Sequence, residues 1–293
     1  MTTSTSSTSA STPERPPFGR LARIVVTVPD PQATGAFLSN GLHFTVIEDA
    51  GHLIATCEGD YATPDGQGAI ELVPGDDHRM ERLVFGMPDA ADLDELAALI
   101  GARRASDTAI HVNDPTGLTV AFEAESRLRV PAPPPSVLRP RRMGHVNLKS
   151  SNPPVSAKFF TQTLDLRLSE YIGESLYWLR TDTEHHNVAL RPGTTGTAHH
   201  LGFEVPGWQA YQPLLDHLDS EGYKIEYGPG RHRPGRSLFV YVCDPSSGMR
   251  LELFADMAHI NDPDAVPIGW EAGDRMTKTL NTWGPTPPQS FLE

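Results

Sequence analysis

An internal repeat in the order of predicted strands and helices limits the folds that this chain can adopt. The runs "RLARIVVTVPDPQATGAFLSNGLHF" (residues 20–44) and "RMGHVNLKSSNPPVSAKFFTQTLDL" (residues 142–166) lie 122 residues apart. Each predicts an apolar strand, a polar break that contains Pro, and then a helix. One structural unit therefore occurs in both halves of the chain.

The two halves continue in the same order. A short strand, a Pro and a helical apolar period recur in residues 82–100 and 199–218. Each half then closes with two β-rich runs around an Asp-Pro and Gly turn, "AIHVNDPTGLTVAFE" and "FVYVCDPSSGMRLELF". Short helices cover only one face of a sheet, so curvature or a partner sheet must close the other. We predict an α+β fold in which tandem βαβββ modules form cupped mixed sheets.

A Pro- and Arg-rich run, "SRLRVPAPPPSVLRPRR", breaks the periodic pattern and divides the chain. The opening residues are polar, without the apolar segment that a leader or an anchor needs. The predicted organisation is a disordered tail (1–18), an N-terminal module (19–125), a linker (126–142), a C-terminal module (143–257) and a C-terminal tail (258–293). We expect the C-terminal tail to cover a site or to contact another subunit.

The composition argues against several classes of function. Lys and Arg number 24 against 37 Asp and Glu, with a formal net charge of -13, and no basic cluster suits a phosphate backbone. We therefore expect no nucleic-acid partner. No stretch approaches the roughly 18 consecutive apolar residues of a membrane span, so we expect no membrane association. Cys57 and Cys243 form no CxxC motif, and a reducing cytoplasm fits them best.

Comparison of the two halves isolates polar residues that the fold itself does not require. His145 in "GHVNL" corresponds to Arg23, and His200 in "HHLGFEV" corresponds to Arg82. Glu252 in "RLELF" corresponds to Phe122 or Ala121, depending on how the turns are aligned. A single His on a strand is commonly a surface residue, but three such differences in one half point to chemistry.

Strand geometry brings these residues together. Alternation places His145 and Asn147 on one face of their strand, away from the apolar face. In the closing hairpin, a four-residue loop (245–248) places Tyr241 opposite Glu252 on the same face. Two neutral imidazoles and one carboxylate, with open positions beside them, form the facial set that holds a divalent non-haem iron. His145, His200 and Glu252 are therefore the predicted metal ligands.

These residues resemble the type I extradiol ring-cleaving dioxygenases of the vicinal oxygen chelate superfamily, which include catechol and homoprotocatechuate 2,3-dioxygenases. The resemblance covers residues 20–257 and is strongest in the second half. The family signature around the carboxylate ligand appears here as His232, Val240, Tyr241, Asp244, Pro245, Gly248 and Glu252. The run "DPSSGMRLE" holds one residue more before Glu252 than the commonest pattern.

The resemblance implies a vicinal oxygen chelate (glyoxalase-like) fold and a role for several further residues. His186, fourteen residues before His200 on a preceding strand, would be the acid-base residue. Tyr241 and His232 would hydrogen-bond the substrate, and Trp178 and Asn147 would line its pocket. Because strand neighbours point in opposite directions, His185 and His199 are expected to face away from the metal.

The implied reaction is oxidative cleavage of a catecholic ring by O2 at Fe(II), with Mn(II) as an alternative ion, to a muconic semialdehyde-type product. The implied assembly is a homo-oligomer, either a dimer or a tetramer. Arg275 or Lys278 in the C-terminal tail is a candidate for contact with a substrate carboxylate. Two alternatives remain: a metal-dependent isomerase, epimerase or lyase on the same scaffold, or a non-catalytic module that binds aromatic compounds.

Overall fold

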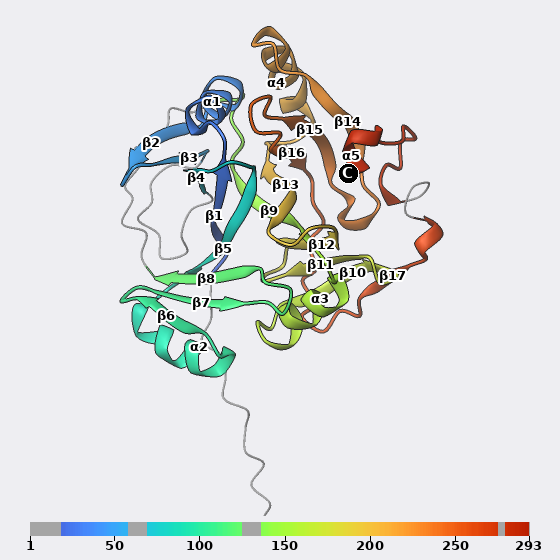
Figure 1. Cartoon of the computed structure of the whole chain (residues 1–293). Coiled ribbons are helices and arrows are strands. Elements are labelled where there is room, and N and C mark those ends of the chain that lie inside the picture. Colours follow the sequence, from blue (N-terminus) through green and yellow to red (C-terminus); the bar gives the residue numbers. More distant parts are fainter. Residues whose placement is uncertain (1–18, 58–68, 125–135, 275–278, 293) are drawn as a thin grey trace, which may run out of the picture.

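Two large mixed sheets make up the chain and lie side by side in Figure 1. The computed structural model describes residues 19–57, 69–124, 136–274 and 279–292. The tail predicted at residues 1–18 and the greater part of the predicted linker lie outside the described residues. Within the described ranges the sheets have eight and nine strands, in the orders β2-β3-β4-β1-β5-β8-β7-β6 and β14-β15-β16-β13-β9-β12-β11-β10-β17.

The strands and helices follow the chain in a regular order. The first sheet contains β1 (Leu21–Val28), β2 (Thr45–Asp49), β3 (His52–Thr56), β4 (Ala69–Pro74), β5 (Arg79–Met87), β6 (Arg103–Ser106), β7 (Ala109–Asn113) and β8 (Thr119–Ala124). The second contains β9 (Arg142–Ser150), β10 (Arg167–Ile172), β11 (Leu176–Arg180), β12 (Val188–Pro192), β13 (Thr197–Glu204), β14 (Ile225–Arg231), β15 (Leu238–Cys243), β16 (Arg250–Ala255) and β17 (Ile268–Trp270). The α-helices are α1 (Pro31–Ala36), α2 (Leu93–Ile100), α3 (Pro153–Gln162), α4 (Trp208–Ser220) and α5 (Gln289–Leu292).

The predicted α+β fold of tandem βαβββ modules is confirmed, and the repeat proves to be finer than the sequence indicated. Each half holds two units, β1-α1-β2-β3-β4 with β5-α2-β6-β7-β8, and β9-α3-β10-β11-β12 with β13-α4-β14-β15-β16. The two units of a half join through one antiparallel pair, β1 with β5 or β9 with β13. The β9–β13 pair carries both predicted histidine ligands, so they lie at the centre of the second sheet.

The helices that open each half begin in the same way. The side chain of Asp30 accepts a hydrogen bond from the Ala33 amide at the start of α1, and Asn152 accepts one from Val155 at the start of α3. A Pro follows each cap, where its missing N–H costs nothing. Among the described residues, no helix is both long and apolar enough to cross a membrane.

The Asp-Pro turns hold the two halves together. A carboxylate oxygen of Asp244 accepts a hydrogen bond of 2.6 Å from the hydroxyl of Thr34 on α1. Asp114 accepts the corresponding bond, 2.5 Å long, from the hydroxyl of Ser156 on α3. Thr34 and Ser156 occupy equivalent positions of the repeat, so each half holds the first helix of the other. Phe203 on β13 also packs edge-to-face against Phe44, with ring centroids 5.0 Å apart.

Candidate metal centre and its cavity

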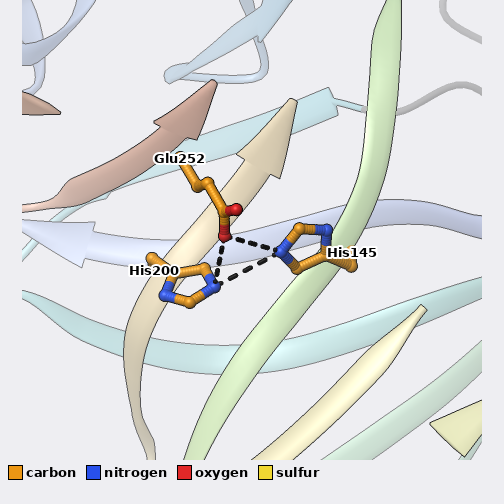
Figure 2. Close-up of side chains that lie close together, drawn as sticks. All are labelled: His145, His200 and Glu252. Atoms are coloured by element: carbon orange, nitrogen blue, oxygen red, sulfur yellow. Dashed lines mark hydrogen bonds and ion pairs between the residues drawn. The ribbon is translucent and has the colours of Figure 1, made fainter. Parts of the chain in front are cut away.

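Three side chains of the second half converge on one point (Figure 2). Nε2 of His145 lies 3.3 Å from Nε2 of His200, and Oε2 of Glu252 lies 3.1 and 3.0 Å from these two nitrogens. All three side chains are buried. Their ligand atoms all lie within 4.8 Å of one another, close enough to bind one metal ion together.

Neighbouring strands position the three groups. Gly202 on β13 pairs with His145 on β9 and with Glu252 on β16, so the two side chains flank a residue that has none. A Cβ atom at position 202 would lie 2.2 Å from the His145 ring. The space for the imidazole therefore depends on Gly202. A glycine inside a strand, as in "HHLGFEV", is a sequence signal for such a close approach.

The electrostatics favour the protonation states that a cation needs. Burial lowers the pKa of His200 to about 4, despite the opposing effect of Glu252. Burial by itself raises the pKa of the Glu252 carboxyl, but the His145 imidazole and the hydrogen bonds from the surrounding histidines outweigh it and hold this pKa well below its usual range. At neutral pH the site therefore presents a neutral His200 and an ionised Glu252.

The donor set fits a divalent ion. Two ligand atoms at about 2.1 Å from one octahedral ion, at right angles, lie about 3 Å apart, and the three observed separations are 3.0, 3.1 and 3.3 Å. Facing imidazole nitrogens repel each other unless a proton or a cation lies between them. Two imidazoles and a carboxylate suit a divalent first-row metal, whereas a structural zinc site would recruit thiolates.

A cavity of about 650 Å³, including its opening to solvent, adjoins this cluster. The predicted site residues that line it are Asn147, Trp178, His186, His200, His232, Tyr241 and Glu252. His145 lies behind them, with its ring 4.5 Å from that of His186. The cavity thus collects side chains from seven strands or their ends, β9 and β11 to β16.

The hairpin geometry predicted from the sequence is confirmed. Tyr241 pairs with Glu252 across β15 and β16, and the Asp244 amide donates to the Met249 carbonyl. The longer turn closes at Gly248, whose φ of +72° favours glycine. The corresponding turn of the first half, "DPTG", is one residue shorter than "DPSSG". When the two hairpins are aligned with this difference, the strand pair Val84–Ala121 of the first half corresponds to Gly202–Glu252 of the second. Ala121, rather than Phe122, is thus the counterpart of Glu252.

Tyr241 and His232 form a polar pair beside the cluster of His145, His200 and Glu252. The Tyr241 hydroxyl lies 3.0 Å from Nε2 of His232, and Nδ1 of His232 lies 2.6 Å from the carbonyl oxygen of Leu280. That carbonyl accepts, so Nδ1 carries a proton, and in the neutral ring Nε2 accepts the Tyr241 proton. Burial raises the pKa of Tyr241 well above its usual value, and the Glu252 charge adds to this effect. The phenol therefore stays protonated.

His186 lies in the loop before β12 rather than on the strand that the sequence suggested. Its Nδ1 lies 3.0 Å from Nδ1 of His185, whose Nε2 lies 3.2 Å from a carboxylate oxygen of Glu170. Burial, reinforced by the neighbouring His145 and His185, lowers the pKa of His186 well below its ordinary value. A neutral imidazole at the cavity wall is able to accept a proton.

The expectation that His199 points in the opposite direction from His200 is wrong. The β9–β13 register shifts between Ala198 and His200, so His199 is an extra residue that forms a β-bulge. Its ring lines the same cavity as that of His200. Strand alternation, on which the expectation rested, fails at a bulge because two neighbouring side chains oppose one residue of the partner strand.

Several cavity residues were missed from the sequence. Arg191 lies two residues after Ala189, which pairs with Trp178 on β11, so strand alternation places it on the cavity side. The C-terminal part of the chain also contributes to the cavity wall, and no local sequence pattern predicts this. The residues are Thr279, Leu280, Phe291 and Leu292. Arg275 and Lys278, considered for a substrate carboxylate, lie outside the described residues.

The corresponding place in the first half carries an ion-pair cluster instead of a ligand set. Arg23 occupies the position of His145, with its Nε 3.0 Å from Glu71 and its Nη2 2.6 Å from Glu123. Ala121 offers no donor atom at the position of Glu252. A guanidinium is a permanent cation and repels a metal ion. The second half alone therefore provides the His, His and Glu set among the described residues.

Several known proteins are similar to this chain. Residues 142–253 match the family described as the Glyoxalase/Bleomycin resistance protein/Dioxygenase superfamily. A metapyrocatechase of Geobacillus stearothermophilus is 35% identical over 142 residues, which cover 46% of this chain and 43% of that protein. A manganese-dependent 2,3-dihydroxybiphenyl 1,2-dioxygenase of Geobacillus genomosp. 3 is 26% identical over 249 residues, which cover 74% of this chain and 79% of that protein. The match thus spans less than half of the first relative.

The fold is likewise shared with solved structures. The homoprotocatechuate 2,3-dioxygenase of Brevibacterium fuscum superposes with a TM-score of 0.80 at 23% identity, covering 95% of this chain and 93% of that one. At this identity the likeness concerns the fold. Residues 142–253 are therefore similar to the Glyoxalase/Bleomycin resistance protein/Dioxygenase superfamily, within a chain that has the vicinal oxygen chelate fold.

Proposed function

We propose that this protein is an extradiol dioxygenase that cleaves a catecholic ring with O2 at a non-haem Fe(II), giving a muconic semialdehyde-type product. The convergence of His145, His200 and Glu252 in a buried cluster beside the cavity carries this proposal. The names of the metapyrocatechase and dihydroxybiphenyl dioxygenase relatives support it. Both atoms of O2 enter the product, so the reaction needs no further reductant.

In this proposal His145, His200 and Glu252 hold Fe(II), and Mn(II) is the alternative ion. Three protein ligands leave positions for the vicinal oxygens of a catechol and for dioxygen. When bound, the ion would supply Lewis acidity toward the catechol oxygens and a one-electron link between the ring and O2. The manganese-dependent relative supports keeping both ions as candidates.

The acid-base role is assigned to His186. Its lowered pKa leaves the imidazole neutral at neutral pH, because burial disfavours the charged form. His186 then accepts a proton from a catechol hydroxyl and returns it to the substrate as the ring opens. Such help commonly accelerates a reaction by about 10²–10⁴-fold.

The remaining residues orient the ring. The Tyr241 hydroxyl can exchange its bond to His232 for one to a substrate oxygen, and Nε2 of His232 can then accept from a substrate hydroxyl, since both groups lie at the cavity wall. Trp178 and Asn147 form a further part of the wall. We also assign a covering role to the C-terminal segment, supported by Thr279, Leu280, Phe291 and Leu292 in the lining. Holding catechol and ion in one geometry lowers the entropic part of the barrier.

The two rival functions predict different behaviour. An isomerase, epimerase or lyase of this scaffold, with ligands shared between modules, would use the first half, where Arg23 and Ala121 stand instead. It would also turn over without consuming O2. A non-catalytic binding module would bind an aromatic compound without a metal and would leave it unchanged.

The test is anaerobic reconstitution with Fe(II), removal of excess metal, addition of catechol, 3,4-dihydroxyphenylacetate or 2,3-dihydroxybiphenyl, and then admission of air. We expect O2 uptake and a yellow product in equal amounts. Glu252→Gln should lose bound metal and O2 uptake together. His259→Gln, which changes an exposed histidine, serves as the matched control. Stoichiometric iron without O2 uptake for any catechol would contradict the proposal.

A further inference from the structure

His199 connects the candidate ligand His200 to the C-terminal segment. Its Nδ1 lies 2.8 Å from Nδ1 of His200, and its Nε2 lies 2.7 Å from the carbonyl oxygen of Phe291. Both imidazoles are buried. On the far side of the His200 ring, Nε2 lies 3.0 Å from Oε2 of Glu252. The Phe291 carbonyl, His199 and His200 thus form a continuous chain of polar contacts from the backbone of α5 to Glu252.

Hydrogen-bond chemistry fixes the protons along this chain. A carbonyl oxygen only accepts, so Nε2 of His199 carries a proton and donates it to Phe291. In the neutral ring Nδ1 of His199 then has a free lone pair and accepts. Nδ1 of His200 therefore donates, which leaves the lone pair of the neutral His200 ring on Nε2. That nitrogen is the one that points at Glu252 and His145.

We propose that His199 is a positioning residue that holds His200 in the metal-binding tautomer, and that docking of the Phe291 carbonyl sets this state. The inference rests on the proposed metal centre at His145, His200 and Glu252. Partners behind a ligating imidazole fix its tautomer and its orientation, and their loss commonly costs about 10–100-fold in metal affinity. Metal retention and the docking of α5 are then thermodynamically linked.

Hydrogen bonds from the sheet hold the backbone of the C-terminal segment in place. Arg191 on β12 donates to the carbonyl of Leu292 over 3.1 Å, and Arg250 on β16 donates to that of Ser290 over 3.0 Å. With the His199 bond, three consecutive carbonyls of the segment accept from three strands of the sheet. The Phe291 ring packs edge-to-face on His199, with centroids 4.7 Å apart, and the guanidinium of Arg250 lies 5.3 Å from its centre.

The β-bulge gives His199 this position. Without the extra residue, His199 would point to the opposite face from His200, and its Nδ1 would not reach the ligand ring. Bulges near active sites commonly redirect a side chain in this way. The first of the two adjacent histidines in "HHLGFEV" therefore acts on the second one through a side-chain hydrogen bond.

Three substitutions separate this role from simple packing. His199→Asn keeps an acceptor oxygen near the Nδ1 position but does not reach Phe291. His199→Gln reaches toward Phe291 but has no acceptor near Nδ1. His199→Leu removes both. We would measure the affinity of the metal-free protein for Mn(II) by competition with a chelator, and its unfolding by urea in EDTA.

We expect the Mn(II) affinity of the Gln and Leu variants to fall by about 10–100-fold and that of the Asn variant by less than about threefold. Urea unfolding in EDTA shows whether the variants differ in stability. If wild-type protein binds Mn(II) and the Asn and Gln variants bind it equally, this inference is wrong while the metal centre stands. If the wild-type protein binds neither Mn(II) nor Fe(II), the metal centre and this inference both fail.

A truncation after Gln289 tests whether the C-terminal segment affects metal binding. It should lower the Mn(II) affinity several-fold in the wild-type background and leave it unchanged in the His199→Leu background, because the link runs through His199. Equal losses in the two backgrounds would show that α5 acts on the metal by another route and would overturn the proposed coupling.

Discussion

Tyr241 and Glu252 are cross-strand partners on β15 and β16, so a protonated phenol lies directly opposite the carboxylate of the candidate metal-binding cluster. The Tyr241 hydroxyl also bonds to His232, which the Leu280 carbonyl orients from the C-terminal part of the chain. This pairing places the Tyr241 hydroxyl on the same side of the hairpin as the Glu252 carboxylate. It is a geometric basis for recognising a substrate oxygen near that carboxylate.

Replacement of Tyr241 by Phe should lower kcat/KM for a catechol by about fivefold. The change removes one hydrogen bond, worth about 1 kcal/mol, and leaves the ring in place. Metal content should not change, because the phenol is not a ligand. Oxygen uptake and metal analysis on the same sample check both points.

Tyr227→Phe is the matched control for that variant. Tyr227 stacks parallel to Tyr241, with ring centroids 6.2 Å apart, but its hydroxyl donates to the carbonyl of Pro285 outside the cavity. Loss of this hydroxyl should leave catalysis within about twofold of the wild type, since one hydrogen bond far from the reacting atoms contributes to stability only. Equal losses of activity in the two variants would refute the role of Tyr241.

His186→Asn should retain bound iron and slow ring opening by about 10²–10⁴-fold. The change removes the neutral imidazole that accepts and returns the proton, while the three ligands remain. Single-turnover measurement with preformed enzyme–catechol complex separates this step from substrate binding. Ring opening at the wild-type rate would exclude His186 as the acid-base residue.

Gly202→Ala should weaken metal binding without touching a ligand. The added Cβ would lie 2.2 Å from the His145 ring, so the imidazole must move. We expect the Mn(II) affinity to fall by at least about tenfold, as for other changes that disturb a ligand's orientation.

Gly273→Ala is the matched control for Gly202→Ala. A Cβ there meets nothing within 4 Å, so binding and stability should change little. Chelator competition with Mn(II) measures the two proteins side by side. Unaltered binding by Gly202→Ala would show that His145 does not need its present position.

The metal-free protein should lose stability as the pH falls below about 6.5, the usual imidazole pKa. Burial lowers the pKa of His186 and His199 well below this value, and that of His200 to about 4. The unfolded chain therefore takes up protons that the folded protein does not. Each imidazole then reduces the free energy of unfolding by up to about 1.4 kcal/mol per pH unit.

Urea unfolding in EDTA at pH 7.5, 6.5 and 5.5 measures this effect. Stability should be constant at the upper end of the range and should fall toward pH 5.5. The lowered pKa of Glu252 also reduces the free energy of unfolding as the pH falls. Its effect begins only at lower pH, where the carboxylate of the unfolded chain takes up a proton. Unfolding that is independent of pH between 7.5 and 5.5 would show that these imidazoles are not buried in the neutral form.

Elements that depend on local pattern could be predicted from the amino-acid sequence. Strand and helix periods revealed the repeat, and its Asx-Pro helix starts recur in the structure at Asp30 and Asn152. Turn chemistry was enough to place Tyr241 opposite Glu252, because register in a hairpin follows from the loop length. The difference between the halves, Arg23 against His145, identified candidate ligands because identical folding roles rarely demand different charges.

Features that depend on contacts between distant segments could not be predicted in this way. The bulge at His199 is invisible in sequence because it is defined by the register against β9. The approach of Phe291 to His199, about 90 residues earlier in the chain, depends on how α5 docks against three strands. Local propensity carries no information on such contacts, since their free energy arises only when the sheet is formed. The sequence thus named the candidate ligands, and the fold determined which groups hold and orient them.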